Sequence, residues 1–362
     1  MKFLQAAIGM VVGAVGLLAS TTASAKNAVI YVHGTADWNP GGVYMNCNGA
    51  QCVFDPIYWG SSSACGTYSC GLFGWFTCDD SCWLWGSGAA ENYWESGNVS
   101  SMANGENYLV VSYQGLSNAP TVGWGQVVDQ IQEYVQTFGI TDITIVTHSD
   151  GANVIRYAEA HPTQPSPTGS GNTWNSAVGS RLAATILMAG TNKGTPLADE
   201  VYTLINLPII GDIADLLIGS AGYVGPAVLY QEQANMQAAN YNWTFGATPD
   251  EGQSYTSYWL NGAYLWDFAG HGSSYNVFGG QCDSYWEAFG LWTVSGLVGW
   301  NWYGDNPSGN TDGFVGQDSA TYIGMQWMTS NNQQNHNQSR RACGSVAPEE
   351  QYILYGVNNY GW

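Results

Sequence analysis

Residues 143–155 read ITIVTHSDGANVI and predict a strand, a sharp turn and a helix in direct succession. The apolar, β-branched run ends at Ser149, and a helical pattern begins immediately after it. A serine at such a turn has a strained backbone that exposes its Oγ above the sheet. Gly151 leaves room for the turn, and the N-terminus of the following helix favours developing negative charge. We therefore predict that Ser149 is a catalytic nucleophile.

A nucleophilic serine needs a base that takes its proton and a carboxylate that orients the base. The chain has five histidines, which are His33, His148, His161, His271 and His336. His148 adjoins the serine on the strand side and cannot easily turn back to it. His161 lies more than two helical turns beyond the serine. The base is therefore either His271 or His336.

The acid is expected between the serine and the base, because that is the chain order in folds built around such a turn. His336 permits this order with Asp312, Asp305, Asp318 or Asp283. His271 would need an earlier acid, such as Asp267, Asp250 or Asp199. Asp312 lies in a turn after a possible strand, where an acid should sit. We predict the triad Ser149–Asp312–His336, with His271 or another aspartate as the alternative.

An oxyanion turn is predicted upstream, where the strand at residues 27–32 runs into His33-Gly34-Thr35. Backbone N–H groups after such a strand can form half of an oxyanion hole. We assign this role to the Thr35 N–H. His33 is expected to hold the loop through side-chain hydrogen bonds.

Strand and helix patterns alternate along the chain, which predicts an α/β fold with a mainly parallel sheet flanked by helices. The predicted strands are Asn107–Tyr113, Arg181–Met188 and Ser274–Gly279, besides those described above. The predicted helices are Ala89–Ala103, Val127–Phe138 ending at Gly139, and a helix from Ser149 to about His161. Residues 200–230 are apolar but interrupted by Pro208 and Gly211, and predict either a lid of short helices or ordinary packing helices.

Residues 38–86 are rich in Cys, Trp and Gly with little periodicity, and predict an irregular insertion that lines a cleft or covers the sheet edge. The rest of residues 26–362 is expected to be one domain. Eight cysteines suggest disulfides, and a zinc cluster is the weaker alternative. The simplest pairing is Cys47–Cys52, Cys65–Cys70, Cys78–Cys82 and Cys282–Cys343.

The N-terminus predicts export. Residues 1–25 have a lysine, an apolar core and an Ala-x-Ala site, so they are expected to be a signal peptide; an uncleaved membrane anchor is the alternative. The mature chain would begin at Lys26 and be secreted, extracellular or periplasmic, with no later membrane span. A net charge of -20 with seven basic residues argues against nucleic-acid binding.

Five segments together resemble the secreted bacterial lipases of the α/β-hydrolase superfamily. They are His33-Gly34-Thr35, Thr147-His148-Ser149-Asp150-Gly151, Asn192–Asp199, Thr311-Asp312-Gly313 and Asn335-His336-Asn337. The resemblance covers about two thirds of the chain. It implies a lipase or esterase, an oxyanion hole formed by the Thr35 and Asp150 N–H groups, and a lid after Asp199.

Two positions depart from the family pattern. Thr147 replaces the usual glycine or alanine. Gln338 stands where some relatives have a calcium-binding aspartate, so a structural calcium is not supported, and no other cofactor is expected.

The sequence thus predicts a secreted serine hydrolase that cleaves carboxylic esters, lipids included, through an acyl-enzyme on Ser149. Three alternatives stay open. The 17 tryptophans and 23 tyrosines suit an extracellular depolymerase acting on a polyester of the polyhydroxyalkanoate type. An acyltransferase would use the same acyl-enzyme, and a non-catalytic protein whose aromatic insertion binds a surface is the third alternative.

Overall fold

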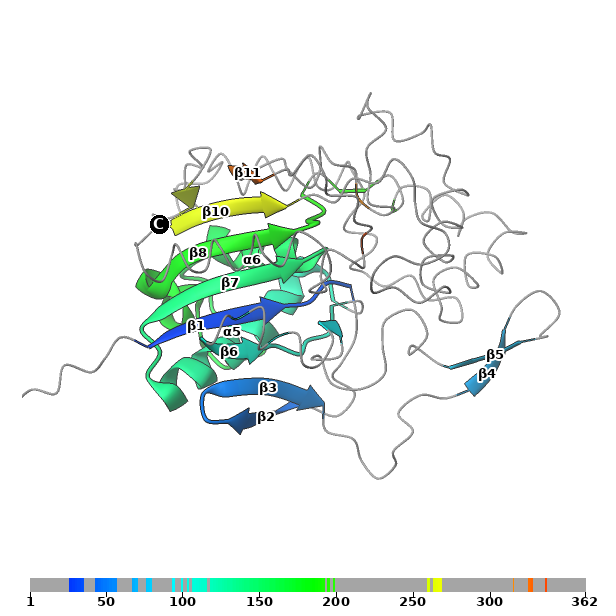
Figure 1. The fold of residues 1–362 in the computed structure, drawn as a ribbon, viewed down its shortest axis with the longest axis horizontal. Helices are drawn as coiled ribbons and strands as arrows, with labels where there is room; N and C mark the ends of the chain where they lie inside the picture. Colours follow the sequence, from blue (N-terminus) through cyan, green and yellow to red (C-terminus); the bar gives the residue numbers. More distant parts are fainter. Residues whose placement is uncertain are drawn as a thin grey trace, which may run out of the picture.

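The protein is built around one large sheet with helices packed against it (Figure 1). The computed structural model describes residues 26–35, 43–56, 67–70, 76–79, 93–94, 99, 103, 106–115, 118–192, 194–195, 198, 259–260, 263–268, 315, 325–327 and 336. The predicted strand at residues 274–279 and the predicted lid at residues 200–230 lie outside this part of the chain.

Within the described residues the large sheet has nine strands, in the order β11-β10-β8-β7-β1-β6-β3-β2, with β9 beside β10. Their bounds are β1 Asn27–Val32, β2 Val43–Asn48, β3 Gln51–Pro56, β6 Asn107–Val110, β7 Asp142–His148, β8 Leu182–Met188, β9 Trp259–Leu260, β10 Ala263–Phe268 and β11 Met325–Trp327. All neighbours from β3 to β11 pair in parallel, while β2–β3 and β9–β10 are antiparallel. The predicted α/β class with a mainly parallel sheet is confirmed.

The long helix α5 spans Pro120–Phe138 and begins earlier than the predicted Val127. Pro120 stands in its first turn, where the missing N–H costs no hydrogen bond. Its end at Gly139 agrees with the prediction, because Gly139 adopts the left-handed conformation at φ 64°. The other described helices are α6 Gly151–Ala160, α7 Trp174–Ala177 and the 3₁₀ turn η2 Gly179–Arg181. No described helix is long and apolar enough to cross a membrane.

Strand β6 ends at Val110, before the predicted Tyr113, because side chains form the hydrogen bonds of the backbone at Ser112 and Tyr113. The side chain of Gln130 accepts from Ser112 N–H and donates to Ser112 O, at 2.9 and 2.5 Å. The ring of His33 accepts from Tyr113 N–H at 3.2 Å. Polar side chains from α5 and the turn after β1 thus make the backbone hydrogen bonds that a neighbouring strand would otherwise make.

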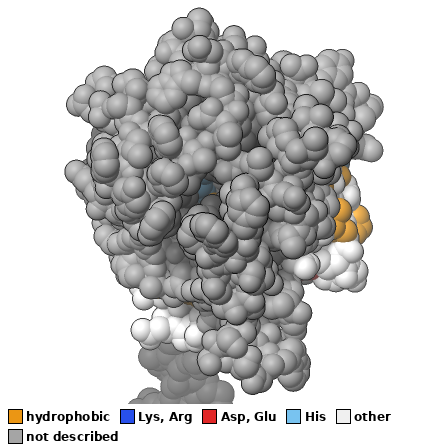
Figure 2. Space-filling view, turned by 90° about the vertical axis from the view of Figure 1, so that its right-hand side faces the viewer, with side chains coloured by type: hydrophobic (Ala, Val, Ile, Leu, Met, Phe, Trp, Pro, Cys, Tyr) orange, Lys and Arg blue, Asp and Glu red, His pale blue; other side chains and the backbone are white. Residues whose placement is uncertain are grey.

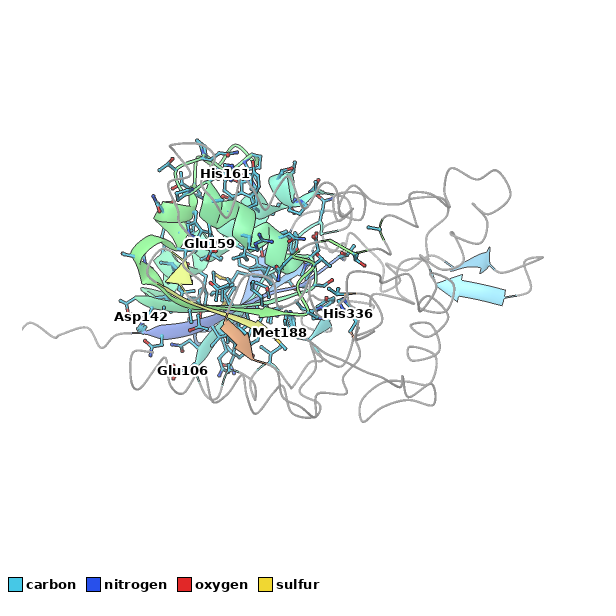
Figure 3. The ribbon with its side chains drawn as sticks, turned by 90° about the horizontal axis from the view of Figure 1, so that it is seen from above. Glu106, Asp142, Glu159, His161, Met188 and His336 are labelled. Atoms are coloured by element: carbon cyan, nitrogen blue, oxygen red, sulfur yellow. A yellow bond between two sulfur atoms is a disulfide. The ribbon has the colours of Figure 1, made fainter. Side chains whose placement is uncertain are left out.

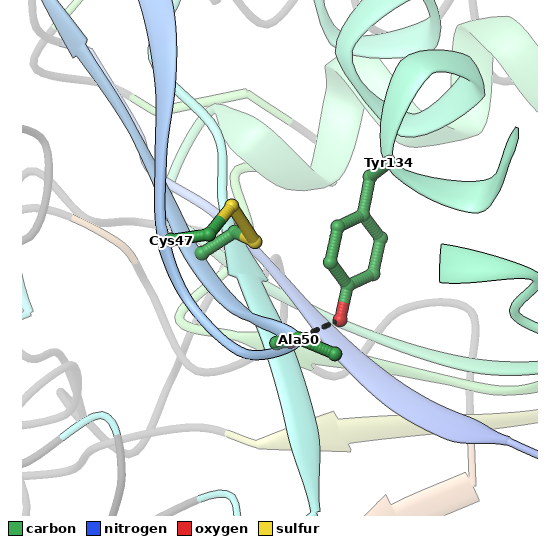
Figure 4. The surroundings of a disulfide bond; sticks show 4 residues. Cys47, Ala50 and Tyr134 are labelled. Carbon is green, nitrogen blue, oxygen red and sulfur yellow. Dashed lines mark hydrogen bonds between the residues drawn. A yellow bond between two sulfur atoms is a disulfide. The ribbon is translucent and has the colours of Figure 1, made fainter. Parts of the chain in front are cut away.

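Part of the predicted irregular insertion forms regular sheet. β2 and β3 make a hairpin, and β3 pairs in parallel with β6, so residues 43–56 extend the sheet edge. The predicted Cys47–Cys52 disulfide closes this hairpin, and the Tyr134 hydroxyl of α5 donates to Ala50 O at 2.6 Å (Figure 4). A separate two-stranded sheet follows, made of β4 Thr67–Cys70 and β5 Phe76–Asp79. The side chains of the other predicted cysteine pairs lie outside the described residues.

The core lies between the sheet and α5. Side chains from β1, β7 and α5 meet there with almost no exposed surface, and burying each large apolar side chain stabilises the fold by about 1.5–3 kcal/mol. The fully buried members include Ile30, Ile145, Trp124, Val127, Ile131 and Tyr134. The central strands β1 and β7 are therefore fixed firmly, and the loops at their carboxyl ends start from a rigid base.

Candidate active site

The turn between β7 and α6 has the strained geometry that the sequence predicts. Ser149 has a φ of 55°, a left-handed conformation that non-glycine residues rarely adopt. Its N–H donates to Met188 O of the neighbouring strand at 2.9 Å, and α6 begins two residues later at Gly151. Ser149 therefore stands directly between a central strand and a helix N-terminus.

Glycines allow two backbones to approach this serine. A Cβ on Gly151 would lie 2.5 Å from His33 O and 2.7 Å from Val32 O, which is closer than atoms can pack. A Cβ on Gly34 would lie 2.6 Å from Ser149 Cβ. The room that Gly151 was predicted to leave is thus occupied by the end of β1, and the turn after β1 touches the serine.

Sheet register places the predicted oxyanion turn beside the serine. β1 and β7 are parallel neighbours, and Val32 pairs with Thr147. Residues 33–35 therefore leave the sheet alongside residues 148–150, at the carboxyl edge. Gly34, the residue before Thr35, lies against Ser149, and Asp150 follows the serine directly. The role of the Thr35 and Asp150 N–H groups as oxyanion donors stays a prediction.

His33 holds this turn through several contacts. Its Nε2 accepts from Tyr113 N–H, and its Nδ1 donates to Gly34 O at 2.8 Å. The Tyr113 hydroxyl donates to His33 O at 2.7 Å, and the two rings stack with centroids 4.2 Å apart. Burial lowers the pKa of His33 to about 3, so the ring stays neutral. These contacts are of the kind that the sequence predicts for His33.

The predicted base His336 lies at the same end of the sheet as Ser149. His148, the residue before the serine, places its Nε2 2.9 Å from His336 O, and the two rings are 4.6 Å apart. Figure 3 shows His336 near Met188, at the end of the sheet opposite Asp142. On the face toward which the central strands point, a small area of histidine surface is visible (Figure 2).

The structure thus brings Ser149, the turn after β1 and the His336 backbone together, although 187 positions separate the serine and the histidine in the numbering of the chain (336 minus 149). Asp312 and the alternative base His271 lie outside the described residues. The assignment of the acid therefore stays a prediction from the sequence.

Thr147, which departs from the pattern of the resembled lipases, is accommodated inside the fold. Its side chain is completely buried, and its hydroxyl lies 3.4 Å from Ile186 O on β8. The larger residue gains a polar contact with the neighbouring strand, which explains how threonine replaces the usual glycine or alanine.

A second strained residue was not predicted. Ala189 follows β8 with a φ of 50°, and it stands beside Ser149 because His148 pairs with Met188. Glycine follows it, and a Cβ on Gly190 would lie 2.9 Å from Ala152 Cβ. The sequence carries no signal for a left-handed alanine, since the conformation depends on how β8 meets the start of α6.

A buried polar row on α6 was also missed. Asp150, Asn153, Arg156 and Glu159 recur every three residues and are all buried. Asn153 Nδ2 donates to Asp150 Oδ1 at 2.9 Å and to Thr191 Oγ1 at 2.8 Å. Burial raises the pKa of Asp150 to about 7 and that of Glu159 to about 8. The regular spacing is the signal that could have revealed this row.

No protein-family model matches the chain, and no curated protein is detectably similar in sequence. The mature form of lipase BlEst2 from Bacillus licheniformis is similar in structure, with a TM-score of 0.54 and 15% identity over 91% of this chain and 93% of that one. Its propeptide form gives the same TM-score and identity, covering 91% of this chain and 50% of that one. EstA from Clostridium botulinum has a TM-score of 0.47 at 12% identity over 93% of this chain and 88% of that one, too distant to support an argument.

These likenesses concern the fold. The sheet and its flanking helices resemble those of α/β-hydrolase lipases. At 15% identity the likeness shows the architecture alone, so the chemistry has to be argued from the residues at the carboxyl edge of the sheet.

Proposed function

We propose that the protein is a serine hydrolase that cleaves carboxylic esters through an acyl-enzyme on Ser149. The observation that carries the proposal is the left-handed backbone of Ser149 between β7 and α6. Strain of this kind persists only where the surrounding structure enforces it, and it clusters at active sites. The likeness in fold to a lipase adds support, because it comes from the whole chain and not from this turn.

In the proposed acylation step, the predicted site residues have separate roles. His336 takes the hydroxyl proton while Oγ attacks the carbonyl carbon of the ester. The N–H groups of Thr35 and Asp150 stabilise the oxyanion of the tetrahedral intermediate. The intermediate collapses as the C–O bond to the alcohol breaks, and the alcohol leaves with the proton from His336.

Deacylation follows the same steps, with water in place of the Ser149 hydroxyl as the attacking group. His336 takes a proton from water, the hydroxide adds to the acyl carbon, and the intermediate collapses to release the carboxylic acid. The proton returns from His336 to Ser149 Oγ. Asp312, carried over from the family resemblance, orients His336 and stabilises its charged form.

The substrate class we propose is lipid or other carboxylic esters, polymeric ones included. We also propose that the protein is exported and acts outside the cytoplasm. The signal-like residues 1–25 support this, and so does the Cys47–Cys52 disulfide, since disulfides persist in oxidising compartments. N-terminal sequencing of exported protein should find Lys26 as the first residue.

Replacing the nucleophile tests the proposed activity. Ser149→Ala should lower kcat for a p-nitrophenyl ester by at least about 10⁴-fold, because the acyl-enzyme can no longer form. Ser180→Ala is the matched control, since Ser180 is exposed on η2, and it should retain full activity. Full hydrolysis by Ser149→Ala would contradict the proposal. Rates on emulsified triglyceride and on solid polyester film then distinguish a lipase from a depolymerase.

A further inference from the structure

His148, the last residue of β7, connects two parts of the site through its ring. Its Nε2 lies 2.9 Å from the backbone oxygen of His336, and its Nδ1 is hydrogen-bonded to the Tyr93 hydroxyl. A carbonyl oxygen can only accept, so Nε2 carries a proton and donates it. In the neutral ring Nδ1 is then the acceptor, and the Tyr93 hydroxyl donates to it. The contacts therefore select one tautomer of His148.

The Tyr93 hydroxyl also lies against the turn after β1. A Cβ on Gly34 would be 2.8 Å from this oxygen and 2.6 Å from Ser149 Cβ. The Tyr93 ring meets the His148 ring at 5.5 Å in an edge-on arrangement, and both side chains are buried. One hydroxyl group thus touches the oxyanion turn while it orients the ring that binds the His336 backbone.

We propose that Tyr93 and His148 form a positioning pair that fixes the backbone of His336 relative to Ser149 and the oxyanion turn. The proposal rests on the proposed function, in which His336 is the base. Neither member of the pair needs to touch the substrate. The pair acts because proton transfer depends on placement, and a misplacement of about 1 Å can cost about 10²-fold in rate.

Packing alone does not account for this arrangement. Tyr93 and Trp94 contact the His148 ring edge-on, which a phenylalanine could also provide. A phenylalanine could not donate to the carbonyl of His336, and it could not accept from Tyr93. One hydrogen bond is at Nδ1 and the other is at Nε2. The Tyr93 hydroxyl therefore orients the His148 ring, and the ring in turn holds the backbone of the proposed base His336 in place.

Two amide variants separate the hydrogen bond to His336 from the bond to Tyr93. In His148→Gln the side-chain nitrogen can reach the position of Nε2 and donate to His336 O. In His148→Asn the shorter side chain reaches only the position of Nδ1, so the bond to His336 is lost. We expect His148→Asn and His148→Phe to lower kcat by about 10–100-fold with KM nearly unchanged, and His148→Gln to recover most of the loss.

Tyr93→Phe removes only the hydroxyl group and provides a milder second variant. It should lower kcat by about 2–10-fold, the worth of one neutral hydrogen bond. In the His148→Phe background the same change should add no further loss, because the bond that it removes is already absent. Additive losses in the double variant would overturn the coupling of the two residues.

Amide hydrogen exchange measures the proposed positioning of the His336 backbone without depending on catalysis. Peptides containing His336 should exchange faster in His148→Asn than in the wild type, and His148→Gln should restore the slower exchange. Equal kcat and equal exchange in the wild type and His148→Asn, or equal impairment of the Asn and Gln variants, would overturn the positioning pair. A wild type that hydrolyses no ester would instead overturn the proposed function, and the catalytic role of the pair with it.

Discussion

Two neighbouring residues at the carboxyl edge of the sheet, Ser149 and Ala189, have left-handed backbones without being glycine. Each such residue costs about 1–2 kcal/mol relative to an unstrained backbone. In the proposed mechanism the strain at Ser149 has a chemical use, because a serine at such a turn presents its hydroxyl above the sheet. The strain at Ala189 has no such use in the proposed mechanism, so relieving it should leave the chemistry intact.

Ala189→Gly should therefore keep or raise the stability of the protein. Relief of the left-handed strain is worth about 1–2 kcal/mol, and the added freedom of glycine in the unfolded chain costs about 0.5–1 kcal/mol. Thermal unfolding should give a free energy of unfolding between unchanged and about 1.5 kcal/mol higher. Ala158→Gly, within α6, is the control and should lose about 1 kcal/mol or more. Equal losses in both variants would refute the strain at Ala189.

At the residue level, the strained backbone of Ser149 was predicted correctly, whereas conformations that depend on distant neighbours were not predicted. The left-handed Ser149 follows from a strand that meets a helix at a serine. Ala189 sits in Met188-Ala189-Gly190, which carries no comparable signature. The Tyr93–His148 contact joins positions far apart in sequence, so only the folded chain reveals it.

At the level of elements, Gly123 inside α5 and Gly139 at its C-cap have opposite effects on the helix. Gly139 ends the helix at φ 64°, where a side chain is strained, and its N–H donates to Val135 O. Gly123 lies inside the helix, and a Cβ there would meet Tyr113 at 3.4 Å, an ordinary contact.

Gly139→Ala should lower the free energy of unfolding by about 1 kcal/mol. Gly123→Ala should raise it by about 0.5–1 kcal/mol, because alanine has the higher helix propensity and the space is available. Urea denaturation of the two variants beside the wild type measures both effects. The same sign of change in both variants would contradict these roles.

The elements that sequence patterns predicted well are β1, β7, α6, β8 and the end of α5, because each has a clear apolar run, helical periodicity or a terminal glycine. The hairpin of β2 and β3 was missed because its strands alternate poorly and, within the described residues, β2 is the edge strand of the sheet. Strand β10 was also missed, and it pairs with β8 although a long stretch of chain separates them. Such pairing is non-local and leaves little trace in local composition.

At the scale of the whole molecule, buried carboxyl groups make stability depend on pH. Burial raises the pKa of Glu159 to about 8, although a hydrogen bond from Thr185 and the charge of Arg156 act against it. The folded protein therefore keeps a proton that the unfolded chain loses near its ordinary pKa of about 4.3. Stability from this group is full at low pH and falls as pH rises from about 4 through about 8.

Glu159→Gln should remove this slope, since glutamine stays neutral and can still accept from Thr185. The variant should match the wild type near pH 4.5 and exceed its free energy of unfolding by about 1–3 kcal/mol near pH 9. Denaturant unfolding at several pH values tests it. Glu133→Gln, on the exposed side of α5, is the control and should change the slope much less. Parallel curves for Glu159→Gln and the wild type would contradict the prediction.

The most direct test of the central claim is covalent labelling with a fluorophosphonate probe, followed by mass spectrometry of the modified peptide. An activated serine attacks phosphorus and expels fluoride, whereas an ordinary serine does not react. The wild type should carry one adduct, on Ser149, and Ser149→Ala should remain unlabelled. An unlabelled wild-type protein, or an adduct on any other residue, would contradict the assignment of Ser149 as the nucleophile.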